Sequence, residues 1–211
     1  MPALPQLRRA MSYLATALLL TLPVASAPAQ SVNQTAVAPI EALDQALVGI
    51  MKAGRETPFQ QRAATLAPVV ERAFDLPDIL EISVGPGWSA LAADQRAALL
   101  AAFRRYTIAS YVDNFDSYDG QRFVISPTTR TLGDGRQVVN TQLVPQTGPA
   151  HTLDYVMRKT DAGWKVVDVL ADGSISRVAL QRSDFSALFN KGGAPALVAR
   201  LQEKTEALSR G

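Results

Sequence analysis

The longest helical pattern in the chain covers residues 91–118. Its large apolar residues recur at steps of three, four or five, which places them on one broad stripe of a helix. No Gly or Pro interrupts the stretch between Ala92 and Asp119, and its many alanines favour helix. We predict a single long helix whose stripe packs against a sheet. The stripe consists of Leu99, Phe103, Tyr106, Tyr111, Phe115 and Tyr118.

Three shorter helical patterns precede the long one. The first has Pro39 in its opening turn and ends at Gly54. The second begins with Thr57 as N-cap and Pro58 after it, is interrupted or kinked by Pro68, and ends near residue 74. The third covers residues 78–84 and stops at the glycines that follow.

After residue 120 the pattern becomes strand-like. Residues 121–131, 137–144, 151–159 and 164–170 are rich in Val, Thr, Tyr and Phe, with turn residues between them. The connections at residues 133–135 and 161–163 are short, which requires antiparallel neighbours. We therefore predict a four-stranded antiparallel meander.

Alternation assigns faces in the last two strands. Leu153, Tyr155 and Met157 share one face of the third strand. In the fourth strand, alternation places Trp164, Val166 and Asp168 on one face and Val167 and Val169 on the other. A strand that is apolar on both faces is covered on both sides or lies centrally in a curved sheet.

The chain then crosses residues 171–181 without a regular pattern. Ser183 is expected to cap a short helix, Gly192 and Gly193 to end it, and Pro195 to open a final helix. The predicted fold class is α+β, with a curved four-stranded antiparallel sheet packed against several helices.

The composition of the 211-residue chain, 47% hydrophobic and 19% charged, is that of a globular protein with one sizeable core. The basic excess comes from Arg8 and Arg9. Without residues 1–29 the count of Lys and Arg falls from 21 to 19, against 19 Asp and Glu. A chain so close to neutral has no basic field for nucleic acid or an anionic membrane surface.

Residues 1–29 are typical of a secretory signal peptide. Two arginines precede an apolar run at residues 13–22, which is shorter than the ~20 residues that a transmembrane helix needs. We expect cleavage after Ala29. The alternative, an uncleaved membrane anchor, is not excluded by the sequence. Residues 30–38 have no periodicity and are expected to form a disordered leader before a single domain at 39–211. The absence of Cys excludes a lipoprotein, disulfides and thiolate metal sites.

Catalytic motifs are scarce. His151 is the only histidine, so zinc motifs such as H-E-x-x-H are impossible, and we expect it to lie at a strand edge. Asp113, Asp116 and Asp119 lack the spacing of a calcium loop and fit a solvated helix end. Asp168 is expected to accept hydrogen bonds from the crossing at residues 173–176. The sequence predicts no metal and no cofactor.

An ordered set of short motifs runs from about residue 40 to residue 208. It comprises Phe74–Asp75, Val84–Gly85 with Trp88, residues 94–96, Tyr111, residues 163–166, residues 168–169, residues 173–176, Phe185 and residues 197–208. Together these resemble the MlaC-type (toluene-tolerance) family of periplasmic lipid carriers. The amino-acid sequences of residues 111–123, 153–158 and 172–185 are similar to those of the HpnM branch, which is associated with hopanoid metabolism.

The resemblance implies helices and a curved sheet that enclose an apolar cavity for acyl chains. It also implies a periplasmic shuttle for phospholipid or hopanoid. The implied partners are an RND-type or ABC-type inner-membrane transporter and an outer-membrane complex. Such carriers have no catalytic residues, in agreement with the scarcity of motifs.

Residue type and predicted face select the candidate lining of the cavity, and each member also fits an ordinary core. Trp88 and Trp164 are assigned to structure. The candidate lining is Phe74, Ile79, Leu80, Val84, Phe103, Tyr106, Tyr111, Phe115, Phe123, Val139, Leu143, Tyr155 and Ile175.

Two alternatives remain open. A small enzyme of a cone-shaped α+β fold would need His151 or Asp168 to point into the cavity. An adaptor without a ligand would have no cavity above ~300 Å³, the low end for small-molecule sites.

Overall fold

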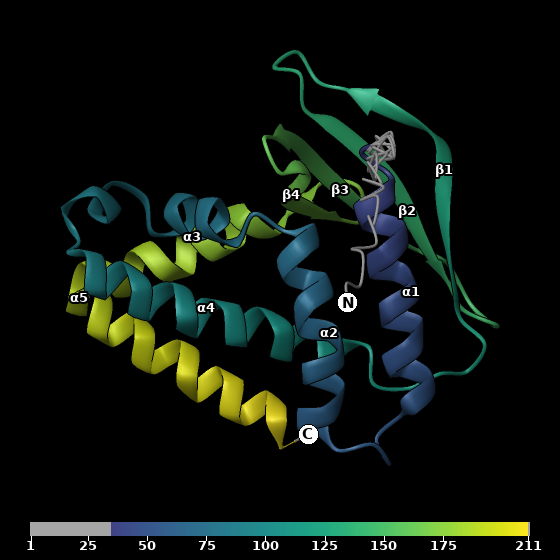
Figure 1. The fold of residues 1–211 in the computed structure, drawn as a ribbon, viewed down its shortest axis with the longest axis horizontal. Helices are drawn as coiled ribbons and strands as arrows, with labels where there is room; N and C mark the ends of the chain where they lie inside the picture. Colours follow the sequence, from purple (N-terminus) through teal and green to yellow (C-terminus); the bar gives the residue numbers. More distant parts are fainter. Residues whose placement is uncertain (1–34, 211) are drawn as a thin grey trace, which may run out of the picture. The chain divides into compact units, whose positions relative to one another are not determined.

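The computed structural model describes residues 35–210. The predicted signal peptide and most of the predicted leader lie outside the described residues. The described part of the chain contains five α-helices, one 3₁₀ helix and five strands, so the α+β prediction is confirmed (Figure 1).

Helix α1 (Ala38–Ala53) has Pro39 in its first turn and ends at Gly54, as the pattern predicts. Gly54 has a φ of 62°, a conformation that glycine adopts without a steric penalty. The buried residues of α1 are Ile40, Leu43, Asp44, Leu47, Ile50 and Met51, which follow one another at helical spacing.

Helix α2 (Phe59–Ala73) differs from the prediction in two ways. It passes through Pro68 without interruption, and Thr57 does not cap it. The Thr57 hydroxyl instead donates to the Ala53 carbonyl at 2.9 Å. Helix α3 (Leu76–Val84) starts two residues before the predicted range and leads into the 3₁₀ helix η1 (Gly85–Ala90).

Helix α4 (Ala93–Asn114) confirms the long helix, with ends two and four residues inside the predicted ones. Leu99 and Phe103 are buried, but Tyr118 lies beyond the helix and is 39% exposed, so its place on the stripe is wrong. The stripe faces the sheet across a pocket rather than packing directly on it. Helices α5, α2 and α3 make the main contacts of α4, and α5 makes the most.

The sheet has five strands in sequential antiparallel order, one more than predicted. The strands are β1 (Arg122–Thr131), β2 (Gln137–Val144), β3 (His151–Thr160), β4 (Gly163–Ala171) and β5 (Ile175–Ser176). Sequence pattern missed β5 because two residues are too few to show alternation. It pairs with the end of β4 and carries the chain into α5.

A bulge in β4 changes the predicted faces. Val166 is opposite Met157 and Asp168 is opposite Val156, so Val167 is an extra residue between them. Val166 and Val169 consequently both join the main core, whereas Val167 packs on the other face with Val138 and Val156. The prediction that Val169 shares a face with Val167 is therefore wrong.

Helix α5 (Arg177–Ser209) is capped at its N-terminus by Ser176, whose hydroxyl accepts from the Ala179 N–H at 2.9 Å. The predicted start at Ser183 is wrong, because the cap lies seven residues earlier. Gly193 has non-helical torsion angles and divides α5 into two helical segments, as the two glycines predict.

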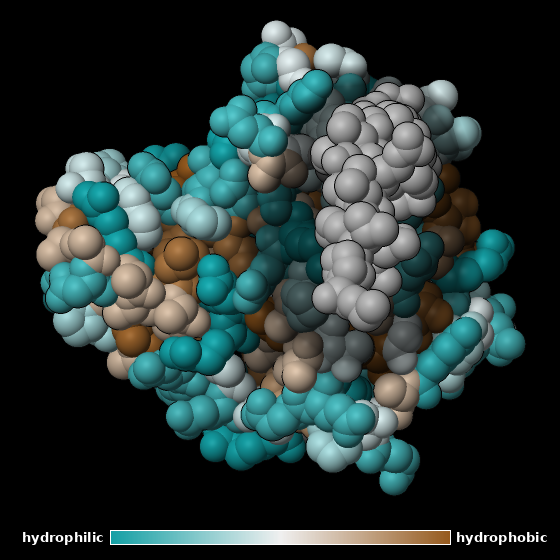
Figure 2. All heavy atoms as spheres, in the orientation of Figure 1, coloured by the Kyte–Doolittle hydropathy of each residue, from teal (hydrophilic) through white to brown (hydrophobic). Residues whose placement is uncertain are grey.

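The arrangement places α4 and α5 side by side, with α3 packed on α5 and α2 between α1 and α4 (Figure 1). The main core joins these helices to the sheet through Val139, Tyr155, Met157 and Val166. On the face drawn in Figure 2, hydrophobic residues are visible between hydrophilic ones over the helices.

Candidate functional site

A pocket of about 370 Å³ lies between the helices and the sheet. Its wall comes from α3, α4, β2, β3, β4 and the first turns of α5, together with Phe74. The pocket is partly open to solvent. Its volume exceeds the ~300 Å³ expected as the upper limit for an adaptor without a ligand.

Aromatic rings build much of the pocket wall. The ring of Tyr111 lies 5.6 Å from that of Phe74 and 6.0 Å from that of Phe115, centroid to centroid. Phe103 packs edge-on against Phe185 at 6.0 Å, which joins the wall to α5. Aromatic pairs at these distances attract one another beyond the burial of their area, so the rings of the wall support each other.

Eight of the thirteen predicted lining residues border the pocket. Helix α4 and its C-cap residue Phe115 supply four of them, because residues at i, i+3 and i+8 share one side of a helix. The eight are Phe74, Ile79, Phe103, Tyr106, Tyr111, Phe115, Leu143 and Tyr155.

The other five predicted residues do not border the pocket. Leu80, Val84 and Val139 are fully or almost fully buried in the core, because they point toward neighbouring elements. Phe123 packs its ring 5.9 Å from that of Phe115 but is not part of the pocket wall. Ile175 is 48% exposed, since β5 is a short edge strand.

Sequence reasoning missed twelve residues of the wall, seven of them polar. Thr107, Ser110 and Asn114 follow the aromatic stripe of α4 at helical spacing, and that spacing is a signal that could have found them. Arg177 and Gln181 lie in a segment predicted to be irregular. The full set of missed residues is Leu76, Thr107, Ser110, Asn114, His151, Leu153, Asp168, Val169, Ala171, Arg177, Val178 and Gln181.

Asp168 borders the pocket but is engaged by hydrogen bonds. Its Oδ1 accepts from the N–H groups of Val169 at 2.8 Å and Val178 at 3.1 Å. Its Oδ2 accepts from the Ser176 hydroxyl at 2.5 Å. The predicted role of Asp168 as acceptor for the crossing is confirmed, and it fastens β4 to the start of α5.

His151 is exposed at the first position of β3, as expected for a residue at a strand edge. It borders the pocket. No acid or nucleophile hydrogen-bonded to its ring occurs among residues 35–210, so the geometry of a catalytic pair is absent from that part of the chain.

Asp44 of α1 is a buried acid beside the aromatic wall. It is 6% exposed, and neither carboxylate oxygen has a hydrogen-bond partner among residues 35–210. Burial, with a smaller effect of Glu41, raises the Asp44 pKa from 3.8 to about 7. Burial also raises the pKa of Tyr155 well above its usual value, and the charge of Asp44 adds to that rise.

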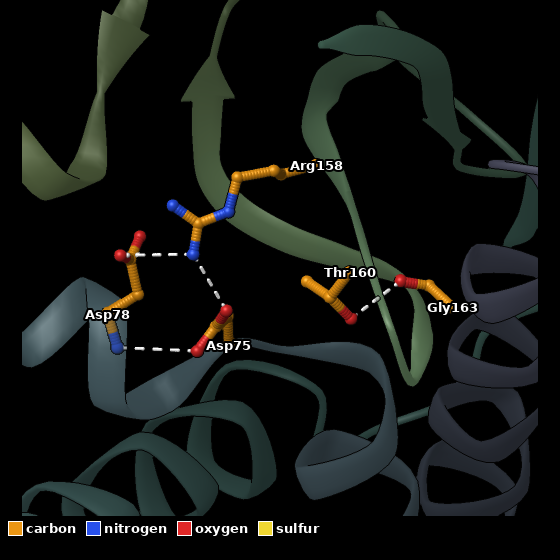
Figure 3. A network of polar contacts seen from close by, with 5 residues as sticks. All are labelled: Asp75, Asp78, Arg158, Thr160 and Gly163. Carbon is orange, nitrogen blue, oxygen red and sulfur yellow. Dashed lines mark hydrogen bonds and ion pairs between the residues drawn. The ribbon is translucent and has the colours of Figure 1, made fainter.

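An ion-pair network holds the first turn of α3 to the sheet (Figure 3). Arg158 of β3 donates to Asp75 at 2.8 Å and lies 3.0 Å from a carboxylate oxygen of Asp78. Asp75 also accepts from the Asp78 N–H at 3.3 Å, and its own N–H donates to Val166 at 2.9 Å. The network positions α3, which contributes Leu76 and Ile79 to the pocket.

Neither a metal site nor a membrane-spanning helix is found among residues 35–210. Within that range no cluster of His, Cys, Asp or Glu has the arrangement of a metal site. None of the helices in the described part of the chain combines the length and apolarity that crossing a bilayer requires.

Comparisons with known proteins agree with the fold. A family model described as "MlaC protein" matches residues 41–203. A search of curated proteins gives no match. Among solved structures, a phospholipid-binding protein from Ralstonia solanacearum, in complex with a phospholipid, superposes with a TM-score of 0.71 at 24% identity. The match covers 82% of this chain and 98% of that one.

Proposed function

The chain belongs to the MlaC protein family, and from that premise we propose that it is a periplasmic carrier that binds a phospholipid by its acyl chains. The family is one of lipid-binding carriers without enzymatic activity, so His151 and Asp168 have no catalytic role. The observation that carries the proposal is the aromatic pocket between α4 and the sheet.

The physical requirement for such a carrier is burial of hydrocarbon. Exposure of an acyl chain to water costs ~0.8 kcal/mol for each CH₂, so a chain of sixteen carbons needs on the order of 13 kcal/mol of compensation. An apolar pocket supplies this without chemistry. The pocket of about 370 Å³ accommodates a substantial part of one such chain, and it is partly open to solvent, so a head group can stay outside it.

The proposal favours phospholipid as cargo because the structurally similar Ralstonia protein was crystallised with one. Hopanoid is the second candidate, and it depends on the resemblance of residues 111–123, 153–158 and 172–185 to the HpnM branch. Export by a signal peptide cleaved after Ala29, and exchange of cargo with membrane-bound transport complexes, complete the proposal. N-terminal sequencing of the periplasmic protein tests the cleavage site.

Mass spectrometry of lipid extracted from natively purified protein tests the proposal directly. We expect phospholipid at close to one molecule for each protein. Consistent recovery of lipid-free protein that takes up nothing from labelled vesicles would refute the carrier function. Recovery of hopanoid alone would keep the carrier and change its cargo.

A substitution that fills the pocket gives an independent test. Val139 is a poor target, since it lies in the core rather than in the pocket wall. Val169 of β4 borders the pocket, whereas Val124 of β1 is 40% exposed and does not. We expect Val169→Trp to displace bound lipid and Val124→Trp, its matched control, to retain it.

A further inference from the structure

The core-facing side of α1 carries a carboxyl group among apolar residues. Asp44 follows Ile40 by four positions and precedes Leu47 by three, so all three lie on one side of the helix, and Asp44 is 6% exposed. Neither carboxylate oxygen has a hydrogen-bond partner among residues 35–210. Buried polar groups in native proteins are almost always paired, so an unpaired buried acid points to a function other than stability.

Two tyrosines of the pocket wall lie within reach of the charge of Asp44. Asp44 itself does not border the pocket, whereas Tyr111 of α4 and Tyr155 of β3 both do. Burial raises the pKa of both phenols, and the charge of Asp44 raises each pKa further, although Arg177 opposes the rise at Tyr111. The electrostatic field of Asp44 therefore extends to the pocket wall.

No cation neutralises Asp44 within residues 35–210, where none of the ion pairs includes it. Arg62 of α2 is buried but donates to the carbonyls of Thr57 and Val112. On α1 itself, Glu41 is a second acid one turn away and disfavours the charged form of Asp44. The other charged residues of α2 and β1 are exposed: Glu71, Arg72, Arg122 and Arg130.

Filling the pocket with lipid changes the surroundings of the two tyrosines and of Asp44 behind them. The pocket is partly open to solvent. Acyl chains that occupy it expel water and lower the local dielectric constant, which favours the neutral form of a buried carboxyl. Proton binding at Asp44 and lipid binding in the pocket then favour each other, because coupling between two sites is reciprocal.

We propose that Asp44 is a pH-sensitive switch that makes lipid binding tighter in acidic than in alkaline surroundings. The switch rests on the proposed carrier function and deepens it, since it regulates the same pocket. Neutral Asp44 is compatible with a dry pocket. Ionised Asp44 is a buried charge without a partner, and it favours the state in which water reaches the pocket.

Calorimetric titration of lipid-free protein from pH 5.5 to pH 8.5 tests the switch. The probe is dioctanoyl phosphatidylcholine, whose head group keeps the same charge throughout this range. We expect the Kd to be about three- to tenfold larger at pH 8.5 than at pH 5.5, which corresponds to a rise of about half to one unit in the Asp44 pKa when lipid binds.

Proton uptake provides a second readout that needs no variant. Titration at about pH 7.5 in two buffers of different ionisation enthalpy measures the protons that accompany binding. We expect wild-type protein to take up a fraction of one proton for each lipid bound. A purely structural role of Asp44 would produce no such uptake.

Three variants assign the pH dependence to a residue. Asp44→Asn should bind the probe at every pH about as tightly as wild type does at pH 5.5, without proton uptake. Glu56→Gln is the matched control, because Glu56 is exposed and is not among the residues that raise the Asp44 pKa, and it should follow wild type. Histidine side chains change charge in the same range, so His151→Gln is measured as well and should keep the pH dependence.

The outcomes separate the switch from the carrier function. Wild-type protein that binds no probe at any pH overturns the carrier function. Equal Kd values at pH 5.5 and pH 8.5 without proton uptake overturn the switch and leave the carrier standing. The same holds if Asp44→Asn keeps the pH dependence of wild type, or if His151→Gln abolishes it.

Discussion

Asp44 gives the sharpest quantitative prediction, because its carboxyl is buried without a partner among residues 35–210. Its pKa is about 7 in the folded protein, against 3.8 for an exposed aspartate. The folded state therefore holds a proton that the unfolded state has already released between these pH values. The contribution of Asp44 to stability is highest below about pH 4, falls as the pH rises to about 7, and is constant above that.

The size of the loss of stability follows from the shift in the Asp44 pKa. Each pKa unit corresponds to ~1.4 kcal/mol, so a shift of about three units costs about 4 kcal/mol at neutral pH. The Asp44→Asn substitution introduces a side chain of nearly the same shape that cannot ionise. We expect this variant to match wild-type stability near pH 4 and to exceed it by up to about 4 kcal/mol at pH 8.

Urea unfolding of lipid-free protein, followed by circular dichroism from pH 4 to pH 8, measures the effect. At each pH, the free energy of unfolding of wild type is subtracted from that of Asp44→Asn. This difference isolates the effect of Asp44, because the contributions of the other carboxyl groups cancel. Glu56→Gln is the control, because Glu56 is an exposed acid whose charge is not among those that raise the Asp44 pKa. Parallel pH profiles for wild type and Asp44→Asn would refute the argument that Asp44 is buried as a neutral acid.

Three further predictions concern stability and fold. Leu80→Ala should lower the free energy of unfolding by about 2–5 kcal/mol, because Leu80 is fully buried. Its control, Ile82→Ala, changes a 41% exposed side chain two residues on and should alter the free energy of unfolding by no more than about 0.5 kcal/mol. Urea unfolding measures both variants. Arg158→Ala should cost about 1 kcal/mol by opening the network that holds α3 to β3, and the surface variant Arg136→Ala should cost less. Equal melting temperatures for these two variants would contradict a clamping role. Asp168→Ala should increase amide hydrogen exchange in the first turn of α5, since the Val178 N–H loses its acceptor, and unchanged protection there would count against it.

Most elements can be located from the sequence because their patterns are local. Strand β2 has the predicted bounds, and α1 and α4 end within a few residues of the predicted positions. The break at Gly193 is also predictable, since consecutive glycines rarely continue a helix. Strand β5 and the early start of α5 are not, because a two-residue strand and a serine cap inside an irregular segment give no periodic signal.

The residues of the pocket also divide into those that the sequence predicts and those that only the tertiary structure identifies. Helical spacing alone places Phe103, Tyr106, Tyr111 and Phe115 on one side of the long helix. Only the tertiary structure decides that Val139 fills the core while Leu143, on the same strand face, borders a pocket.

Alternation assigns a side chain to a face of a strand, but whether that face meets another element or a pocket depends on how distant elements pack. For the same reason, only the packing of α5 against α4 brings Arg177 and Thr107 to one wall. Local periodicity therefore determines the aromatic side of the pocket, and contacts between segments far apart in the chain determine its polar side.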